Sequence, residues 1–284
     1  MKEFGYVVDS TFYLTQEEVK KFDVAVVDLN VIDGEKSYKE SEITPQFVYE
    51  RQDAGAGLTT SQPSPQEFMD AYTAQFNKGY QRLYVFTLSK GLSGTYQSAM
   101  IARNESDHKE NIYIFDTDNA AYGNQLVFFE AMKLAEKSKS AADFEAGVQK
   151  VIESADLLFN VENLFSLQQG GRLSKAQALL GTAMRVKPML VLEEGKLTLG
   201  GKARTYNKLL DMIVEKIEAG KDPKKTLVVR IIGINSDDAL NQMKERVESV
   251  FTKVEVSTTR YIGPVFSVHV GKKGFGLAWY YRSN

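Results

Sequence analysis

A short run of hydroxyl side chains and glycines, Ser89–Thr95, has the residue types of a small anion-binding loop. The stretch before it, Leu83–Leu88, is apolar and rich in β-branched and aromatic residues, which predicts a buried strand. The residues after it favour a helix, with Ser93 or Thr95 as the candidate N-cap. A tight turn from strand into helix leaves backbone N–H groups unpaired at the positive end of the helix dipole. Because Lys90 is the only cation in this run, we expect a small anionic group held by hydroxyls and amides, rather than a polyphosphate.

The same loop could supply a nucleophile if a histidine lay beside Ser93. His108 stands among charged residues and is typical of a solvated loop, whereas His269 lies in the apolar run Val265–Val270, which we interpret as a strand. A lone histidine in such a run is more often structural than catalytic. The sequence Gly91–Thr95 also departs from the G-x-S-x-G nucleophile elbow at its last position. We therefore keep an acyl ester hydrolase that uses Ser93 and His269 as an alternative to a protein that only binds an anionic group.

Three aspartates, Asp9, Asp116 and Asp118, follow predicted strands and could meet at one edge of a sheet. Carboxylates in that arrangement could bind Mg²⁺, but they more often accept hydrogen bonds from neighbouring backbone N–H groups. The absence of cysteine and the wide separation of the two histidines argue against zinc. We therefore expect a structural role for these aspartates and no metal site.

A Gly-Gly-Arg sequence, Gly170–Arg172, could form a turn into a helix that we extend over 172–184. It lacks the G-x-x-x-x-G-K-[ST] pattern of a nucleotide P-loop. It could equally end one helix and begin the next. In either arrangement Arg172 can present its guanidinium to a phosphate or to the carboxylate of a partner.

The residues discussed so far need a scaffold, and the alternation of apolar runs with helical segments predicts one. We expect residues 1–156 to form an α/β domain with a mostly parallel sheet flanked by helices, whose carboxyl edge gathers the polar loops. Residues 157–284 combine hairpin patterns with helices, which predicts an α+β domain with a mixed or antiparallel sheet. The predicted strands of the first domain are 4–8, 24–29, 83–88 and 112–115.

Composition narrows the class of protein further. Of the 284 residues, 43% are hydrophobic and 25% charged, as in ordinary globular proteins. The net charge of −2 argues against general nucleic-acid binding. The sequence has no cysteine, no signal-peptide pattern at its start and no apolar window of membrane-spanning length, so we expect a cytoplasmic protein.

Apolar residues cluster early in the predicted second domain. Such clusters are normally core, but a pocket for a lipid is an alternative that composition leaves open. The members of the cluster are Phe159, Phe165, Leu167, Leu179, Leu180, Met184, Met189 and Leu190.

Six short motifs occur in a fixed order along nearly the whole chain. They are 8–11 (Val-Asp-Ser-Thr), 60–64 (Thr-Ser-Gln-Pro-Ser), 92–99 (Leu-Ser-Gly-Thr-Tyr-Gln-Ser-Ala), 170–174 (Gly-Gly-Arg-Leu-Ser), 187–188 (Lys-Pro), and 262–264 (Ile-Gly-Pro) with 269–271 (His-Val-Gly). In this set the chain resembles the DegV family, the fatty-acid-binding proteins that serve as the binding subunit of bacterial fatty acid kinase.

The resemblance implies a two-domain α/β protein with a long-chain fatty acid buried between the domains. It implies no enzymatic activity and no cofactor for this chain, which would present the fatty acid carboxylate to a separate ATP-dependent kinase for acyl-phosphate formation in phospholipid synthesis. It also implies that Arg172 lies near the surface used by that kinase, and it is compatible with transient contact with a membrane surface. The residues implied to hold the carboxylate are Thr60, Ser61, Ser93, Gly94, Thr95 and His269.

One motif departs from the family pattern. The family usually has His-x-Gly-Pro-Gly, whereas this chain continues from His269 through Gly271 to Lys272 and Lys273. The added charge could favour anionic lipid head groups or an acidic partner face. We favour the simpler interpretation of two solvated lysines.

Overall fold

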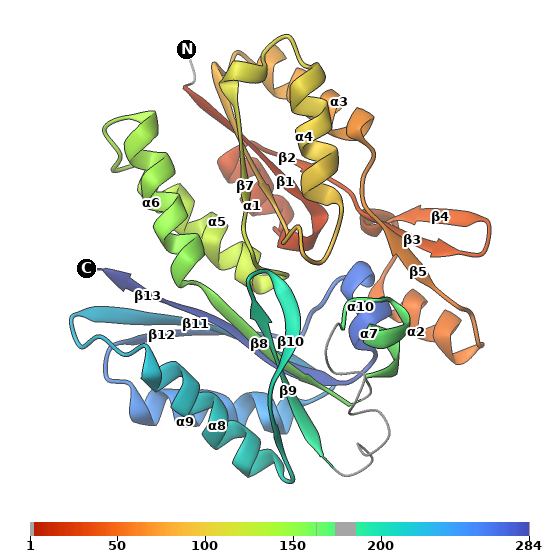
Figure 1. Ribbon diagram of the computed structural model, residues 1–284, viewed down its shortest axis with the longest axis vertical. Helices are drawn as coiled ribbons and strands as arrows, with labels where there is room; N and C mark the ends of the chain where they lie inside the picture. Colours follow the sequence, from red (N-terminus) through yellow and green to blue (C-terminus); the bar gives the residue numbers. More distant parts are fainter. Residues whose placement is uncertain (1–2, 163, 174–185, 284) are drawn as a thin grey trace.

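A four-stranded parallel sheet forms the centre of the N-terminal part of the computed structural model, which describes residues 3–162, 164–173 and 186–283 (Figure 1). The strand order is β2-β1-β6-β7, with all neighbours parallel. Its strands are β1 (Phe4–Asp9), β2 (Val24–Val27), β6 (Arg82–Thr87) and β7 (Ile112–Asp116). The prediction of a mostly parallel first sheet is therefore confirmed, although β2 ends two residues before the predicted strand 24–29.

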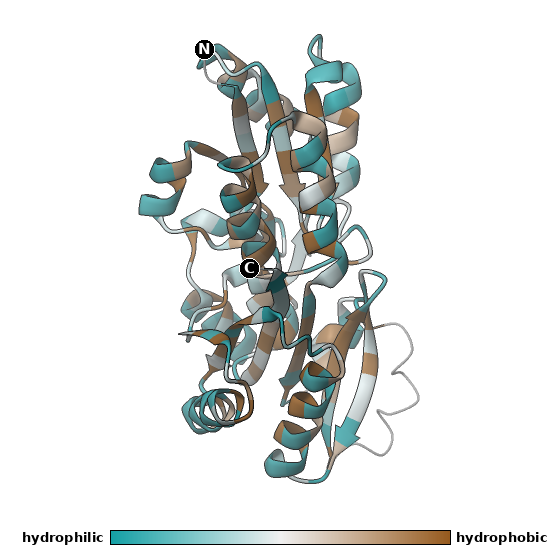
Figure 2. Ribbon diagram, turned by 90° about the vertical axis from the view of Figure 1, so that its left-hand side faces the viewer, coloured by the Kyte–Doolittle hydropathy of each residue, from teal (hydrophilic) through white to brown (hydrophobic). Residues whose placement is uncertain are grey.

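Helices cover both faces of this sheet, and each face has its own hydrophobic core (Figure 1). Val7 and Val85 face α3 and α4, whereas Phe86 and Phe115 face α5 and α6. The strands are apolar on both faces for this reason, and Figure 2 shows hydrophobic residues along them and hydrophilic residues on the helices around them. The helices are α1 (Gln16–Phe22), α3 (Pro65–Asn77), α4 (Thr95–Glu105), α5 (Tyr122–Ala135) and α6 (Ala141–Ser154).

A six-stranded mixed sheet forms the centre of the C-terminal part, with the order β10-β9-β8-β13-β11-β12. Only the pair β11 and β12 is parallel within the described ladder. One face packs on α8 (Tyr206–Ala219) and α9 (Asp237–Val250), and this confirms the predicted mixed sheet with packed helices. The strands are β8 (Asp156–Val161), β9 (Lys187–Glu193), β10 (Lys196–Ala203), β11 (Lys225–Ile234), β12 (Val254–Thr259) and β13 (Gly274–Ser283).

A small three-stranded sheet, which the sequence did not predict, projects beside the first sheet (Figure 1). Its order is β4-β3-β5, and all its pairs are antiparallel. It comprises β3 (Asn30–Asp33), β4 (Lys36–Lys39) and β5 (Thr59–Ser61), and it is accompanied by α2 (Pro45–Asp53). Three-residue 3-10 turns occur as η1 (Ser10–Phe12), η2 (Glu40–Glu42) and η3 (Lys109–Asn111).

The C-terminal part contributes one helix, α10 (Pro264–Val270), to the core of this small unit. Val265 and Val268 pack against Val31 and Val48 there. The interpretation of 265–270 as a strand is wrong, because Gly263 caps a helix that begins with Pro264, the residue favoured at a first helical position. Packing against the small sheet overrides the β preference of the valines.

Some of the other predictions concern residues that the structure does not describe. The predicted helix 172–184 lies mostly outside the described residues, as do Leu179, Leu180 and Met184 of the apolar cluster. A short helix, α7 (Phe165–Gln169), precedes that segment. The strands of the first and small sheets come from residues 4–116 and those of the mixed sheet from 156–283, while the domain boundary at 156/157 stays a prediction. Among the described helices, none has the length and apolar character needed to cross a membrane.

Candidate functional site

An apolar cavity lies at the carboxyl edge of the parallel sheet, where it meets the mixed sheet and α10. Leu29, Leu88 and Ala120 follow three strands of the parallel sheet, and Ile232 comes from the mixed sheet. The empty space, counted together with its opening to solvent, is about 980 Å³. Ligands of open parallel sheets bind at this edge, so the position of the cavity agrees with the predicted gathering of polar loops.

Five of the predicted site residues line this cavity: Thr60, Ser61, Ser93, Arg172 and His269. We call these five the polar ring. No acidic residue is among the described residues that line the cavity. The two remaining predicted residues, Gly94 and Thr95, follow Ser93 in the chain and do not belong to the described lining.

The polar ring is closed by a continuous series of contacts. The Thr60 Oγ1 atom lies 2.8 Å from Nε2 of His269. A Cβ atom on Gly170 would lie 2.5 Å from Nδ1 of the same histidine, so these two residues touch. Arg172 donates from Nη1 to the Gly170 carbonyl at 2.6 Å and from Nε to the Leu92 carbonyl at 3.2 Å, which returns the series to the loop that carries Ser93.

The last link joins the loop of Ser93 to strand β5. A Cβ atom on Gly94 would lie 3.0 Å from Nε2 of Gln62, the residue that follows Ser61. Glycine at this position leaves room for the side-chain amide of Gln62 beside the start of α4. The polar ring therefore combines a strand, two loops and a helix from four separate parts of the chain.

The loop Ser89–Thr95 has the predicted position between β6 and α4, but its N-cap differs from the prediction. Gly94 is the N-cap residue of α4, so the assignment of this role to Ser93 or Thr95 is wrong. Ser93 Oγ accepts from the N–H of Thr95 at 3.3 Å and lies 2.9 Å from the Thr95 hydroxyl. Lys90 pairs with Asp116 at 3.2 Å and is not among the described lining residues.

A turn of the mixed sheet holds this loop in place. Ser89 is fully buried and donates from Oγ to the carbonyl of Gly195 at 2.6 Å. Gly195 has φ +70°, and a Cβ atom there would lie 2.3 Å from Ser89 Oγ. Two features therefore require glycine at position 195: its positive φ angle and the close approach of the Ser89 side chain.

His269 is neutral at physiological pH. Burial, and secondly the charge of Arg172, lower the pKa of His269 to about 4. Its Nε2 atom contacts Thr60, whereas Nδ1 has no hydrogen-bond partner among the described residues. A neutral imidazole of this kind can orient the Thr60 hydroxyl but carries no charge to pair with an anion.

Arg172 supplies the positive charge of the polar ring. It is half-buried and has no carboxylate partner among the described residues; the resemblance had placed it near a surface used by a kinase. Burial lowers the pKa of Arg172 from its usual value, but a guanidinium stays protonated at neutral pH. The arrangement can therefore receive one negative charge with hydroxyl donors around it.

The geometry gives Ser93 and His269 separate partners. Ser93 contacts Thr95, and His269 contacts Thr60. No hydrogen bond joins Ser93 to His269 in the described part of the chain, so the pairing that a hydrolase requires is not formed. The structure offers no support for the hydrolase alternative.

Asp9 and Asp116 have the structural role that the sequence predicted for the aspartates at the strand ends. Asp9 is fully buried and accepts from the backbone of Thr11 at 3.0 Å and of Leu88 at 2.7 Å. Burial raises the pKa of Asp9 to about 6, against the opposing effect of these hydrogen bonds. Asp116 accepts from the N–H groups of Lys90 and Asp118. Within residues 3–162, 164–173 and 186–283, no group of three histidine or acidic side chains is placed to hold a metal ion.

The two lysines that replace Pro-Gly are half-exposed, but each has a carboxylate partner. Lys272 pairs with Asp53 at the end of α2, and Lys273 lies 3.7 Å from Glu162. The interpretation of two simply solvated lysines is therefore incomplete, because both tie the loop after α10 to other segments.

Sequence reasoning missed two buried polar residues near the cavity. Asn160 lines it and donates from Nδ2 to the Pro188 carbonyl at 2.7 Å. A polar residue between Phe159 and Val161 in a strand-like apolar run is a signal that could have identified it. Glu40 contacts the start of α10, and no pattern in its polar surroundings marks it as buried.

The fold and site define a class of α/β protein with two large sheets and an apolar cavity closed by hydroxyls, an imidazole and a guanidinium. A family model described as "DegV family" matches residues 3–282, and the chain belongs to this family. The DegV domain-containing protein lin2658 of Listeria innocua is 31% identical over 280 residues, which cover 98% of each chain.

Solved structures agree with this assignment. One is described as showing fatty acid binding of a DegV family protein from Thermus thermophilus; its TM-score is 0.88 at 29% identity, with 98% of this chain and 99% of that chain covered. DegV from Bacillus subtilis, described as a fatty acid binding protein, has a TM-score of 0.85 at 27% identity, with 99% and 100% covered. A stearic acid-binding protein from Eubacterium ventriosum has a TM-score of 0.86 at 27% identity, with 99% of each chain covered.

Proposed function

We propose that this chain binds one long-chain fatty acid, with its acyl chain in the apolar cavity and its carboxylate at the polar ring. The observation that carries the proposal is the composition of the cavity wall: it is apolar except for a few polar groups, and Arg172 supplies a cation where no acidic residue is described. The fatty acids bound by the proteins from Thermus thermophilus, Bacillus subtilis and Eubacterium ventriosum support the same ligand class.

The physical chemistry of such a ligand fits this wall. Each CH₂ group moved from water into an apolar cavity contributes about 0.8 kcal/mol, so the affinity comes mainly from the acyl chain. A buried carboxylate must be hydrogen-bonded or paired with a cation. The hydroxyls of Thr60, Ser61 and Ser93 can donate hydrogen bonds, and Arg172 can balance the charge.

The neutral state of His269 defines its role in this proposal. Because its pKa is about 4, the ring does not pair ionically with the carboxylate at pH 7. If Nε2 carries the proton, it donates to Thr60 Oγ1 and leaves the Thr60 hydroxyl proton for the ligand. We propose that His269 orients Thr60 in this way and that Gly94 and Thr95 fix the position of Ser93.

We further propose that the bound carboxylate is presented to a separate ATP-dependent fatty acid kinase. In that reaction a carboxylate oxygen attacks the γ-phosphorus of ATP, and acyl phosphate and ADP are formed. The family resemblance supports this step, and the separate partners of Ser93 and His269 agree with a chain that has no catalytic pair of its own. The proposal places the protein in the cytoplasm, with Arg172 near the kinase contact and transient approach to a membrane surface for exchange of the lipid.

The first experiment identifies the ligand. Protein purified from cells is denatured and extracted, and mass spectrometry is expected to find fatty acid close to one molecule per chain. Delipidated protein is then titrated with palmitate and stearate by calorimetry. Empty protein together with no heat of binding for either acid would refute the proposal.

The second experiment tests the coupled reaction. The loaded protein is mixed with ATP and the fatty acid kinase of the same organism, and hydroxylamine traps any acyl phosphate as the hydroxamate. Hydroxamate that needs all three components supports the presentation role. Release of free acid from acyl esters by this chain alone would favour the hydrolase instead.

A further inference from the structure

Helix α10 carries His269, but its polar anchors lie in the N-terminal part of the chain. Ser267 donates from Oγ to Tyr49 Oη at 3.3 Å, and Gln52 donates from Nε2 to the Val268 carbonyl at 3.1 Å. Both partners belong to α2. A helix of two turns is not stable alone, so its position depends on these hydrogen bonds as well as on the packing of its valines against the small sheet and α2.

Glu40 holds the beginning of the same helix. This side chain is buried, and its Oε1 atom accepts from the N–H of Val265 at 3.0 Å. Its Oε2 atom accepts from the Ser10 hydroxyl at 2.5 Å. Ser10 Oγ accepts in turn from the N–H of Leu29 at 3.1 Å. One carboxylate therefore joins η1, η2 and α10.

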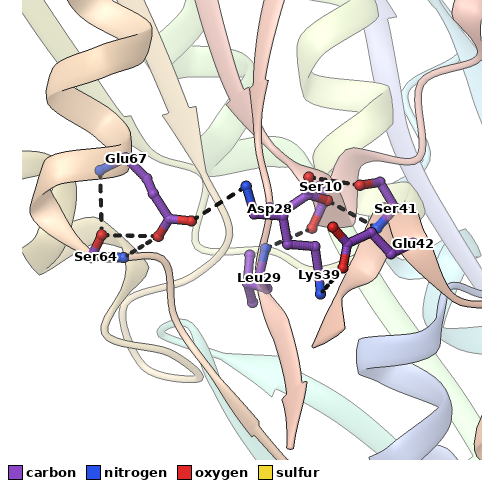
Figure 3. A network of polar contacts seen from close by, with 8 residues as sticks. All are labelled: Ser10, Asp28, Leu29, Lys39, Ser41, Glu42, Ser64 and Glu67. Atoms are coloured by element: carbon purple, nitrogen blue, oxygen red, sulfur yellow. Dashed lines mark hydrogen bonds and ion pairs between the residues drawn. The ribbon is translucent and has the colours of Figure 1, made fainter. Parts of the chain in front are cut away.

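The turn that presents Glu40 is fixed on both sides. Ser41 donates from its backbone and its hydroxyl to Asp28, at 3.0 and 2.8 Å. Lys39 donates from its backbone to Glu42 at 3.2 Å and approaches Glu67 of α3 at 3.9 Å (Figure 3). These contacts, together with the hydrogen bond from the Glu40 N–H to the Leu29 carbonyl at 2.9 Å, hold the backbone of Glu40 in place.

Close packing shows that the carboxylate is built into this position. A Cβ atom on Gly263 would lie 2.2 Å from the ring of Tyr13 and 2.5 Å from Glu40 Oε1, so glycine is needed for the chain to pass both side chains. No lysine or arginine pairs with Glu40 in the described part of the chain, and burial raises the pKa of Glu40 to about 7. An acid without a cationic partner is costly to bury. The hydrogen bonds that Glu40 accepts from Val265 and Ser10 offset part of that cost and join α10 to η1.

Val265 and His269 are four residues apart and so lie on the same face of α10, one turn from each other. We infer that Glu40 is a positioning residue of the carboxylate site: it anchors the first turn of α10 and thereby holds His269 against Thr60. The inference deepens the proposed function and rests on it for the ligand. The fixed geometry means that a ligand meets a preformed His269–Thr60 pair.

Loss of this anchor should reduce the fraction of molecules in which α10 is in place. The apparent affinity falls in proportion to that fraction. Replacement of Glu40 by Ala removes both acceptor atoms, whereas replacement by Gln keeps one acceptor for Val265 and gains a donor for Ser10. Glu35→Ala is the matched control, because Glu35 is an exposed glutamate in the turn between β3 and β4, outside η2 and α10.

The test uses the full chain with ¹⁵N-labelled histidine, without and with stearate. The chain has two histidines, so His108, which is exposed, serves as the internal reference for the imidazole signals of His269. Glu40→Ala should shift or broaden the His269 signals, leave those of His108 unchanged, and weaken stearate binding about tenfold. Glu40→Gln and Glu35→Ala should keep the His269 signals and should bind within about threefold of the unaltered protein.

The outcomes separate the two proposals. Unchanged His269 signals and unchanged affinity in Glu40→Ala would overturn the positioning role while leaving fatty acid binding intact. If the unaltered protein does not bind stearate, the proposed function fails, and the His269 signals still decide whether Glu40 positions the helix. If Glu40→Ala does not fold, the Glu40→Gln protein decides the question. Glutamine can still hydrogen-bond to Val265 and Ser10, so displaced His269 signals in that variant would overturn the positioning role.

Discussion

Replacement of Thr60 by Val tests the polar ring at its most informative contact. Valine keeps the shape of the side chain and replaces the hydroxyl with a methyl group. That hydroxyl lies 2.8 Å from Nε2 of His269, and both residues line the cavity. The substitution therefore takes one donor from the proposed carboxylate site and one partner from a buried imidazole.

The magnitude follows from these two losses. A buried polar group left without its partner costs about 1–3 kcal/mol. His269 loses its Nε2 partner with or without ligand, so that part affects the free energy of unfolding and not the affinity. The lost donor to the carboxylate affects binding, and about 1–3 kcal/mol corresponds to a dissociation constant about 5- to 150-fold higher.

The assay is calorimetric titration of delipidated protein with stearate, accompanied by thermal unfolding of each variant. Thr59→Val is the matched control, because Thr59 precedes Thr60 on β5, is exposed, and directs its side chain to the other face of the strand. Affinity in Thr60→Val within twofold of the unaltered protein would refute the placement of the carboxylate. An equal loss in Thr59→Val would show that β5 itself, rather than the hydroxyl, had been disturbed.

Three further changes test separate parts of the reasoning. Arg172→Ala removes the cation of the polar ring, so it should raise the stearate dissociation constant about tenfold or more and also lower the yield of kinase-dependent hydroxamate; an unchanged dissociation constant would contradict the proposal that Arg172 balances the carboxylate charge. Gly170→Ala should displace His269, since a Cβ atom would lie 2.5 Å from Nδ1, and it should lower the free energy of unfolding by about 1–3 kcal/mol. Gly57→Ala is its control, because no atom lies within 4 Å of a Cβ atom there, and equal losses in chemical denaturation would contradict the argument. Burial raises the pKa of Glu40 from its ordinary value of 4.5 to about 7 in the folded protein, so the folded state holds more protons between these values and stability falls as pH rises through them. Thermal unfolding should therefore show the unaltered protein losing stability relative to Glu40→Gln between pH 4.5 and about 7, and a constant difference would contradict the assignment. The other titratable groups that face Glu40 are the same in both proteins: Asp9, Asp28, Tyr13 and Tyr261.

Local signals in the sequence were sufficient for the parallel sheet. Its strands are buried on both faces, so each appears as a short apolar run such as Leu83–Leu88, and each is followed by polar residues at its carboxyl end. Asp9 and Asp116 were correctly predicted to accept from backbone N–H groups, because part of that role is local: Asp9 accepts from Thr11 and Asp116 from Asp118.

The predictions that were wrong or missing concern residues whose conformation depends on contacts with distant parts of the chain. The run Val265–Val270 has the composition of a strand and forms a helix, because Glu40 and α2 supply its anchors. The short strands of the small sheet lack a long apolar run that would mark them in the sequence. Val31 is buried there together with Val265 and Val268 of α10, which are distant in the sequence. The cavity could not be separated from ordinary core, because its apolar wall is assembled from residues between 29 and 276.

The origin of the polar ring explains why these distant contacts matter for binding. Thr60, Ser61 and Ser93 come from the N-terminal part, whereas Arg172 and His269 come from the C-terminal part. Neither part holds the whole set of donors, so the proposed carboxylate site requires both parts. The Ser89–Gly195 contact and the Glu40–Val265 contact perform that joining at two places beside the cavity. A ligand whose head group contacts both parts and whose acyl chain fills the space between them therefore stabilises the same arrangement that creates its site.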